Sequence, residues 1–173
     1  MQIFVETERL LLRELLPSDD RGMFELDSAF EVHRYLGNKP IKRIEESRNA
    51  IEFIRQQYLE NGIGRWAVIE KETNCFVGWA GLKYVKETTN CHTNFYDLGY
   101  RFIKRFWGNG YATEAAEASI DFGFEQLKLK DIYAMVDVNN GASRRVLEKV
   151  GLTFIETFDL NGNAHNWFRI SRA

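Results

Sequence analysis

The residues with the clearest chemical potential form a turn with glycines at alternate positions, residues 105–113 (RFWGNGYAT). Glycine adopts backbone conformations that let neighbouring N–H groups converge on one point. A helix predicted to follow the turn adds its unpaired N-terminal N–H groups and the positive end of its dipole. Arg101, Lys104 and Arg105 place positive charge on the same side. The turn is therefore suited to an anion such as a diphosphate.

Two common phosphate-binding motifs do not account for this turn. The GxGxxG fingerprint of dinucleotide-binding folds fails because Thr113 stands where its third glycine belongs, and the GxxxxGK[ST] motif is absent. Taken alone, Gly108 and Gly110 could equally form a tight turn that binds nothing. The elements that position the turn therefore have to be considered with it.

Hydrophobic periodicity divides the first third of the chain into a strand and two helices. Residues 7–16, rich in Leu and charge, are predicted to be the first strand. A Pro-Ser-Asp-Asp segment then starts a helix whose apolar residues recur at positions 23, 26 and 30. Residues 43–60 are predicted to form a second helix, which ends at an Asn-Gly pair.

The remainder of the chain alternates between strand and helix patterns. We expect strands at 66–69, 76–85 and 95–103, a loop at 86–94, a helix at 108–127, a strand at 132–138, a short helix at 140–150, and a closing hairpin of strands 152–158 and 167–170. Antiparallel strands thus precede a βαβ unit. This order predicts an α+β domain with a mixed sheet.

Three blocks of sequence around the turn resemble the GNAT superfamily of N-acetyltransferases. They are DLGYR at 97–101, the R-x-x-G-x-G turn with its helix start at 105–115, and NxxSRRVLEKVG at 140–151. With TERLLLR at 7–13, the chain looks most like the RimJ/RimL-like branch, which acetylates ribosomal-protein N-termini. The resemblance implies one domain over residues 1–173, a GNAT-like fold with a mixed, mostly antiparallel sheet whose central parallel strands splay apart between flanking helices.

The resemblance also implies acetyl-CoA as co-substrate and direct transfer of its acetyl group to a primary amine in a ternary complex. Phe102 and Ile103, on the splayed strand, would pair with the pantetheine arm by main chain, and a backbone N–H there would stabilise the oxyanion. The implied acetyl-CoA site comprises Phe102, Ile103, Arg105, Phe106, Trp107, Gly108, Asn109, Gly110, Tyr111, Ala112, Thr113, Asn140 and Ser143.

Two residues are implied to take part in catalysis. Many relatives use a Tyr on the short helix to protonate the leaving thiolate, but this chain has Leu147 there, and Ser143 is the hydroxyl that resembles the substitute acid. Asn140 and Ser143 could equally be the N-cap and first turn of a helix. Asp97 is the candidate base, although it could equally be a solvated strand carboxylate.

The acceptor is not specified by any motif. At pH 7 about a tenth of α-amines, with pKa about 7.7–8.0, are neutral, against below ~0.1% of lysine amines. A site without an obvious strong base therefore favours a peptide N-terminus, while polyamines and xenobiotic amines stay open. Because Leu147 replaces the usual Tyr, a non-catalytic acyl-CoA-binding or sensor domain is a further alternative.

The overall composition limits the classes of protein and of binding site that the chain could represent. The 173 residues are 45% hydrophobic and 28% charged, which is typical of one globular domain. A net charge of -2 argues against nucleic-acid binding. Cys75 and Cys91 are too few for a disulfide framework, and with scattered histidines they indicate no metal site. No secretory or membrane-spanning segment stands out, so we expect a cytoplasmic monomer or homodimer.

Overall fold

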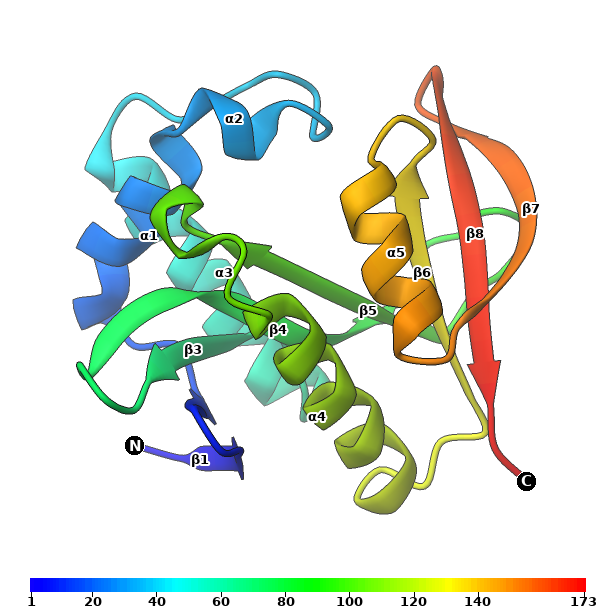
Figure 1. Ribbon diagram of the computed structural model, residues 1–173, viewed down its shortest axis with the longest axis horizontal. Helices are drawn as coiled ribbons and strands as arrows, with labels where there is room; N and C mark the ends of the chain where they lie inside the picture. Colours follow the sequence, from blue (N-terminus) through cyan, green and yellow to red (C-terminus); the bar gives the residue numbers. More distant parts are fainter.

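The computed structural model describes all 173 residues and contains one eight-stranded sheet in the order β1-β2-β3-β4-β5-β6-β8-β7 (Figure 1). The strands are β1 (Ile3–Glu6), β2 (Leu10–Arg13), β3 (Trp66–Glu70), β4 (Cys75–Val85), β5 (Phe95–Phe102), β6 (Asp131–Asp137), β7 (Thr153–Leu160) and β8 (Asn163–Ser171). The helices are α1 (Asp20–Ser28), α2 (Phe30–His33), α3 (Ile44–Asn61), α4 (Tyr111–Glu125) and α5 (Gly141–Lys149). Two short 3-10 turns, η1 (Pro17–Asp19) and η2 (Lys104–Phe106), complete the chain.

The centre of the sheet is its least regular part. β5 and β6 are its only parallel neighbours, and a single backbone pair, Asp97 with Tyr133, joins them. Beyond that pair the two strands diverge toward the end of β5 (Figure 1). The other neighbours pair antiparallel, and β4 pairs with β5 along the whole of β5, from Gly78–Phe102 to Val85–Phe95. The predicted α+β fold with splayed central strands is confirmed.

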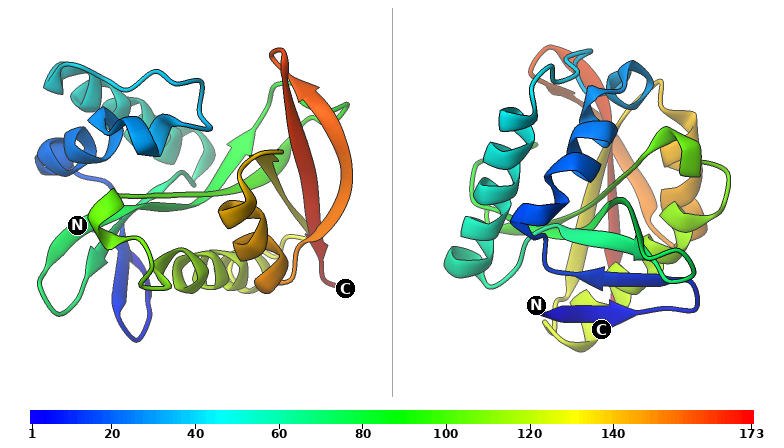
Figure 2. Two further views of the ribbon diagram at one scale, coloured as in Figure 1. Left: turned by 45° about the horizontal axis from the view of Figure 1, so that its top comes forward. Right: turned by 90° about the vertical axis from the view of Figure 1, so that its left-hand side faces the viewer.

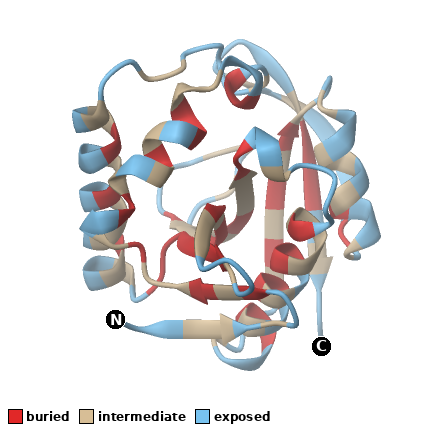
Figure 3. Cartoon of the chain, turned by 60° about the vertical axis from the view of Figure 1, so that its left-hand side comes forward, coloured by how far each residue is buried: buried red, intermediate tan, exposed pale blue.

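Helices cover both faces of the sheet. Figure 2 shows α1, α2 and α3 on one side and α4 on the other, with α5 on the α4 side beside β6. Each layer has its own core: Ala115, Ala116 and Ile120 of α4 lie in one apolar cluster, and Met23 of α1 and Ile51 of α3 lie in another. The buried residues follow these inner faces (Figure 3). No helix in the chain is at once long enough and apolar enough to cross a bilayer.

The N-terminal region differs from its prediction in two ways. The first strand is shorter, at Leu10–Arg13, and the separate strand β1 precedes it, which the pattern did not indicate. The first helix ends at Ser28, because Ala29 adopts an extended conformation, and Phe30, which begins α2, is 61% exposed. Its helical spacing from Met23 therefore does not mean a shared buried face.

The later elements agree with prediction except at their boundaries. α4 begins at Tyr111 rather than residue 108, because Gly108 and Gly110 have φ of +82° and +79° and cannot continue a right-handed helix. The closing hairpin turns at Asn161-Gly162, both at positive φ, as a two-residue turn requires. On α5 the deeply buried residue is Leu147, at 2% exposed.

Candidate active site

The glycine turn lies at the end of β5, where the strand has separated from β6. Trp107, Gly108, Asn109 and Gly110 are all exposed, so the backbone of the turn faces solvent. A Cβ added to Gly108 would meet no atom within 4 Å, and one added to Gly110 would meet only a guanidinium nitrogen of Arg9, at 3.4 Å. The space over the turn is therefore open to a ligand.

The N-terminus of α4 supplies unused donors to the turn. Gly110 is the N-cap and makes no side-chain capping bond, and the first helical bond runs from the Glu114 N–H to the Gly110 carbonyl. The N–H groups of Tyr111, Ala112 and Thr113 precede that bond and have no carbonyl within the helix to donate to. These N–H groups and the positive end of the α4 dipole favour an anion at the open turn.

The three basic side chains near the turn do not add free charge to it. Arg105 forms a bidentate ion pair with Glu25 of α1, with its Nε 2.7 Å from Oε1, and this pairing raises the pKa of the guanidinium. Arg101 and Lys104 likewise pair with carboxylates of α1 and α2. An anion at the turn would therefore be held mainly by backbone N–H groups and not by these three side chains.

Of the predicted pair Phe102 and Ile103, only Phe102 directs its backbone N–H and C=O groups toward the gap between β5 and β6. The Ile103 N–H donates to the Val77 carbonyl of β4, and the Ile103 carbonyl accepts from the Phe106 N–H, so both groups are used. In an antiparallel strand the groups of Phe102 then point to the opposite edge, toward β6. The indole Nε1 of Trp107 donates to the Phe102 carbonyl at 2.8 Å. The Phe102 N–H is thus the main-chain donor left for a ligand.

The later block of sequence places Ser143 beside the same edge of β5. Asn140 is the N-cap of α5, and its Oδ1 accepts from the Ser143 N–H at 3.2 Å. The Ser143 hydroxyl lies 3.0 Å from the phenol oxygen of Tyr100, which also donates to the Ser143 carbonyl at 3.1 Å. The capping role of Asn140 therefore holds, and it leaves the side-chain amide N–H₂ group available.

Tyr100 is a site residue that sequence analysis left without a role. Its side chain joins β5 to α5 across the divergent strands, and it lies on the same side of β5 as Phe102 because side chains two residues apart share a face. Burial raises the pKa of Tyr100 to about 12, although the bond with Ser143 lowers it. The phenol is thus protonated at neutral pH and can share its proton with the Ser143 hydroxyl.

Asp97 lies on the other face of the sheet from Tyr100 and Ser143, because odd and even residues of β5 point to opposite sides. Its Oδ2 lies 2.6 Å from the Arg65 guanidinium, which also donates to the backbone carbonyls of Gly81 and Asp97. Burial raises the pKa of the Asp97 carboxyl, and the charge of Arg65 opposes that effect. Its Oδ1 is buried without a partner. The structure does not bring the two predicted catalytic residues into contact.

The Arg65 side chain can lie against β5 only because residue 99 of that strand is a glycine. A Cβ on Gly99 would lie 2.7 Å from the Arg65 guanidinium. Beside it, the Trp79 ring lies between two guanidinium groups, with Arg65 at 5.3 Å and Arg101 at 5.0 Å from its centroid. The face of β4 and β5 that lies beneath α1 and α2 is therefore lined with polar and aromatic side chains.

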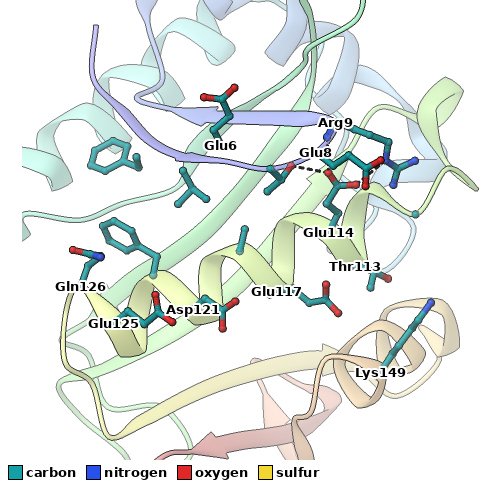
Figure 4. Close-up of a pocket in the computed structure, with 16 residues that line it drawn as sticks. Glu6, Glu8, Arg9, Thr113, Glu114, Glu117, Asp121, Glu125, Gln126 and Lys149 are labelled. Atoms are coloured by element: carbon teal, nitrogen blue, oxygen red, sulfur yellow. Dashed lines mark hydrogen bonds and ion pairs between the residues drawn. The ribbon is translucent and has the colours of Figure 1, made fainter.

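A groove of about 1010 Å³ lies on the outer side of α4, next to the β1–β2 turn (Figure 4). Its carboxylates outnumber its basic side chains, which are Arg9 and Lys149; the acidic residues are Glu6, Glu8, Glu114, Glu117, Asp121 and Glu125. This charge does not suit a polyanionic ligand such as CoA. The glycine turn, which meets the groove at Gly110 and Thr113, is therefore the better candidate for an anion site.

The comparison with known proteins decides the family. The sequence profile described as "Acetyltransferase (GNAT) domain" matches residues 9–153, which include Arg9, the glycine turn and α5. The chain belongs to the GNAT family. It is an acetyl-CoA-dependent N-acetyltransferase, as the relatives below also indicate, and the exposed donors of the glycine turn fit the diphosphate of that co-substrate.

Several relatives of this GNAT acetyltransferase align over most of its length. The uncharacterized N-acetyltransferase YoaA of Bacillus subtilis is 32% identical over 85% of this chain and 81% of its own. Spermidine N(1)-acetyltransferase of Escherichia coli is 26% identical over 92% of this chain and 83% of its own. A GNAT acetyltransferase structure from Bacillus anthracis has a TM-score of 0.80 at 28% identity and covers 97% and 98% of the two chains. RimL, a ribosomal-protein α-N-acetyltransferase solved with coenzyme A, shares the fold at 17% identity, with a TM-score of 0.78 and 98% coverage of each chain.

Proposed function

We propose that this acetyltransferase acts on the α-amine of a peptide N-terminus, as a member of the RimJ/RimL-like branch. The TERLLLR, DLGYR and NxxS blocks of the sequence support that branch. The site has no obvious strong base to deprotonate an acceptor, which favours an α-amine. The pKa of such an amine, about 7.7–8.0, leaves about a tenth of it neutral at pH 7. A small polyamine is the second candidate, because the spermidine acetyltransferase of Escherichia coli aligns with 92% of this chain.

One observation carries the assignment of the co-substrate site. The glycine turn, the Phe102 N–H and the Ser143 hydroxyl lie along the one edge of β5 that β6 leaves unpaired. In our proposal residues 105–113 bind the diphosphate, chiefly by backbone N–H groups, and the side-chain amide of Asn140 contacts the pantetheine arm. Bound acetyl-CoA supplies the activated acetyl group as a thioester.

The proposed roles in the transfer follow from the same geometry. The amine nitrogen forms a bond to the acetyl carbon while the carbon–sulfur bond breaks. The Phe102 N–H is the donor placed to stabilise charge on the acetyl oxygen. The Ser143 hydroxyl gives a proton to the departing sulfur and takes the phenol proton of Tyr100 in its place, and solvent water then returns a proton to Tyr100. The proton lost by the amine passes through water to Asp97 Oδ1, which is buried on the opposite face of the sheet.

The acceptor class is tested with labelled acetyl-CoA and two substrate panels, peptides with free N-termini and linear polyamines. Mass spectrometry locates the label, and kcat/KM ranks the acceptors. We expect the label on peptide α-amines and the highest kcat/KM for a peptide. A higher kcat/KM for polyamines would refute the peptide proposal, and hydrolysis without transfer to any amine would refute both.

The base is tested by Asp97→Asn with Lys83→Met as the control, because Lys83 is the cross-strand neighbour of Asp97 on the same face. If Asp97 accepts the proton, the asparagine variant loses roughly 10²–10⁴-fold in kcat with the acceptor ammonium, and raising the pH restores part of the rate. The affinity for acetyl-CoA stays unchanged in both variants. A variant that keeps the wild-type kcat and pH profile would remove Asp97 from the mechanism.

A further inference from the structure

Arg9, in the turn between β1 and β2, reaches across the molecule to the glycine turn. Its guanidinium NH1 donates to the carbonyl of Asn109 at 2.7 Å, and its Cζ lies 4.7 Å from the centroid of the Tyr111 ring. The two turns are 100 residues apart in sequence. Arg9 is therefore the long-range side chain that fixes a backbone group inside the turn itself.

A carboxylate of α4 holds Arg9 in this position. Glu114 Oε2 accepts from Arg9 Nε at 2.7 Å, and Oε1 accepts from the Arg9 backbone N–H at 3.0 Å and from the Thr7 hydroxyl at 2.6 Å (Figure 4). The Glu114 side chain is 18% exposed, so these bonds are partly shielded from water. Glu114 belongs to the first turn of the helix whose N-terminus forms the anion site.

The bond to Asn109 determines where the next N–H group points. In a trans peptide the C=O of one residue and the N–H of the next are antiparallel. Arg9 takes the Asn109 carbonyl on one side, so the Gly110 N–H points to the other side. Glycines have wide backbone freedom, and without this bond the peptide between Asn109 and Gly110 can rotate. Arg9 therefore reduces the number of orientations available to the donors of the turn.

We propose that Arg9 is a positioning residue for the diphosphate half of the acetyl-CoA site, and that Glu114 is the group that orients it. The inference rests on the proposed role of residues 105–113. Arg9 acts through the Asn109 carbonyl and contacts neither the acetyl group nor the amine. Its fork geometry is essential, because Nε binds Glu114 while NH1 binds Asn109, and a lysine has no second donor at a fixed angle.

The test compares two thioesters, acetyl-CoA and S-acetylpantetheine, of which only the first carries a diphosphate. Arg9→Met is expected to raise the KM for acetyl-CoA on the order of tenfold, with kcat and the KM for S-acetylpantetheine unchanged. Glu114→Gln is expected to do the same to a smaller extent, and the double variant no more than Arg9→Met alone. Arg9→Lys is expected to behave like Arg9→Met.

Arg172→Met is the matched control, because Arg172 also combines an ion pair, with Asp121 at 3.1 Å, and a contact with an aromatic ring, that of Phe124 at 4.6 Å. It should leave both KM values unchanged. An Arg9→Met variant that affects both thioesters equally, or neither, would overturn the positioning role. Full rescue by Arg9→Lys would show instead that Arg9 is a charge contact to phosphate.

The two proposals fail separately in this design. If the wild-type enzyme has the same KM for both thioesters, the diphosphate site itself is misplaced and the proposed role of residues 105–113 is wrong. If the wild-type enzyme strongly prefers acetyl-CoA and Arg9→Met retains that preference, the site stands and only the role of Arg9 is refuted. Thermal denaturation of each variant confirms that the comparison is made on folded protein.

Discussion

The Gly108→Ala variant separates the effect of backbone strain on stability from the effect of an added methyl group on ligand binding. Gly108 has φ of +82°, and a residue with a Cβ costs roughly 1–2 kcal/mol in that region. For a domain of this size we therefore expect the melting temperature to fall by about 2–8 °C. Nothing in the protein lies within 4 Å of the new methyl group, so no internal clash adds to this cost. The methyl group can collide only with a ligand that approaches the turn.

Gly62→Ala provides the matched control. Gly62 ends α3 at φ of +71°, and an added Cβ there also meets nothing within 4 Å, so the strain should be about equal. Calorimetric titration with acetyl-CoA, at a temperature where both variants are folded, isolates the effect on binding. We expect Gly108→Ala to weaken binding by tenfold or more, on the order of 1.4 kcal/mol, and Gly62→Ala to leave it unchanged. Equal affinities in the two variants would refute the assignment of the glycine turn.

Three further predictions follow from single contacts. Tyr100→Phe removes the bond to the Ser143 hydroxyl and should lower kcat roughly tenfold, with no further loss in a double variant with Ser143→Ala; additive losses in steady-state kinetics would contradict a shared role. Burial alone would raise the pKa of Glu114, but bonds from Thr7 and Arg9 outweigh it, and the net pKa lies below its ordinary value. Its ionised form therefore stabilises the fold above the pKa of the unfolded state, and this stabilisation is lost as the pH falls. Glu114→Gln should flatten the acid side of the stability–pH curve in urea denaturation, and an unchanged slope would exclude this effect. Gly78→Ala should prevent folding, seen as loss of near-UV circular dichroism, because its Cβ would overlap a backbone carbonyl of β5.

The turn and the helices around it were predictable because their signals are local. Two glycines at alternate positions mark the turn, and an Asn-Gly pair marks the end of α3. β1 gave no such signal, because four residues are too short for a clear alternation. Its stability comes instead from pairing with β2 and from the Phe4 ring, which stacks 5.0 Å from that of Trp66.

The partners of the site residues were not predictable because they come from distant parts of the chain. Basic residues next to the turn suggested free positive charge, but Arg105 meets Glu25, 80 residues earlier. Tyr100 stands within the DLGYR block, yet the contact that brings it to the candidate site is with Ser143, 43 residues later. A single sequence shows which residues are present near a site and does not show which of them the fold has already paired.

Leu147 stands where the sequence resemblance led us to look for a catalytic acid. Because a single backbone pair links β5 to β6, its place in the core gives it a structural role instead. Leu147 is 2% exposed and belongs to the same apolar cluster as Leu98 of β5 and Ala134 of β6. One backbone pair joins those strands, so side-chain contacts of this cluster set how far the two halves of the sheet stand apart. A larger or smaller residue at 147 would therefore change the separation of β5 and β6, and with it the gap beside Phe102.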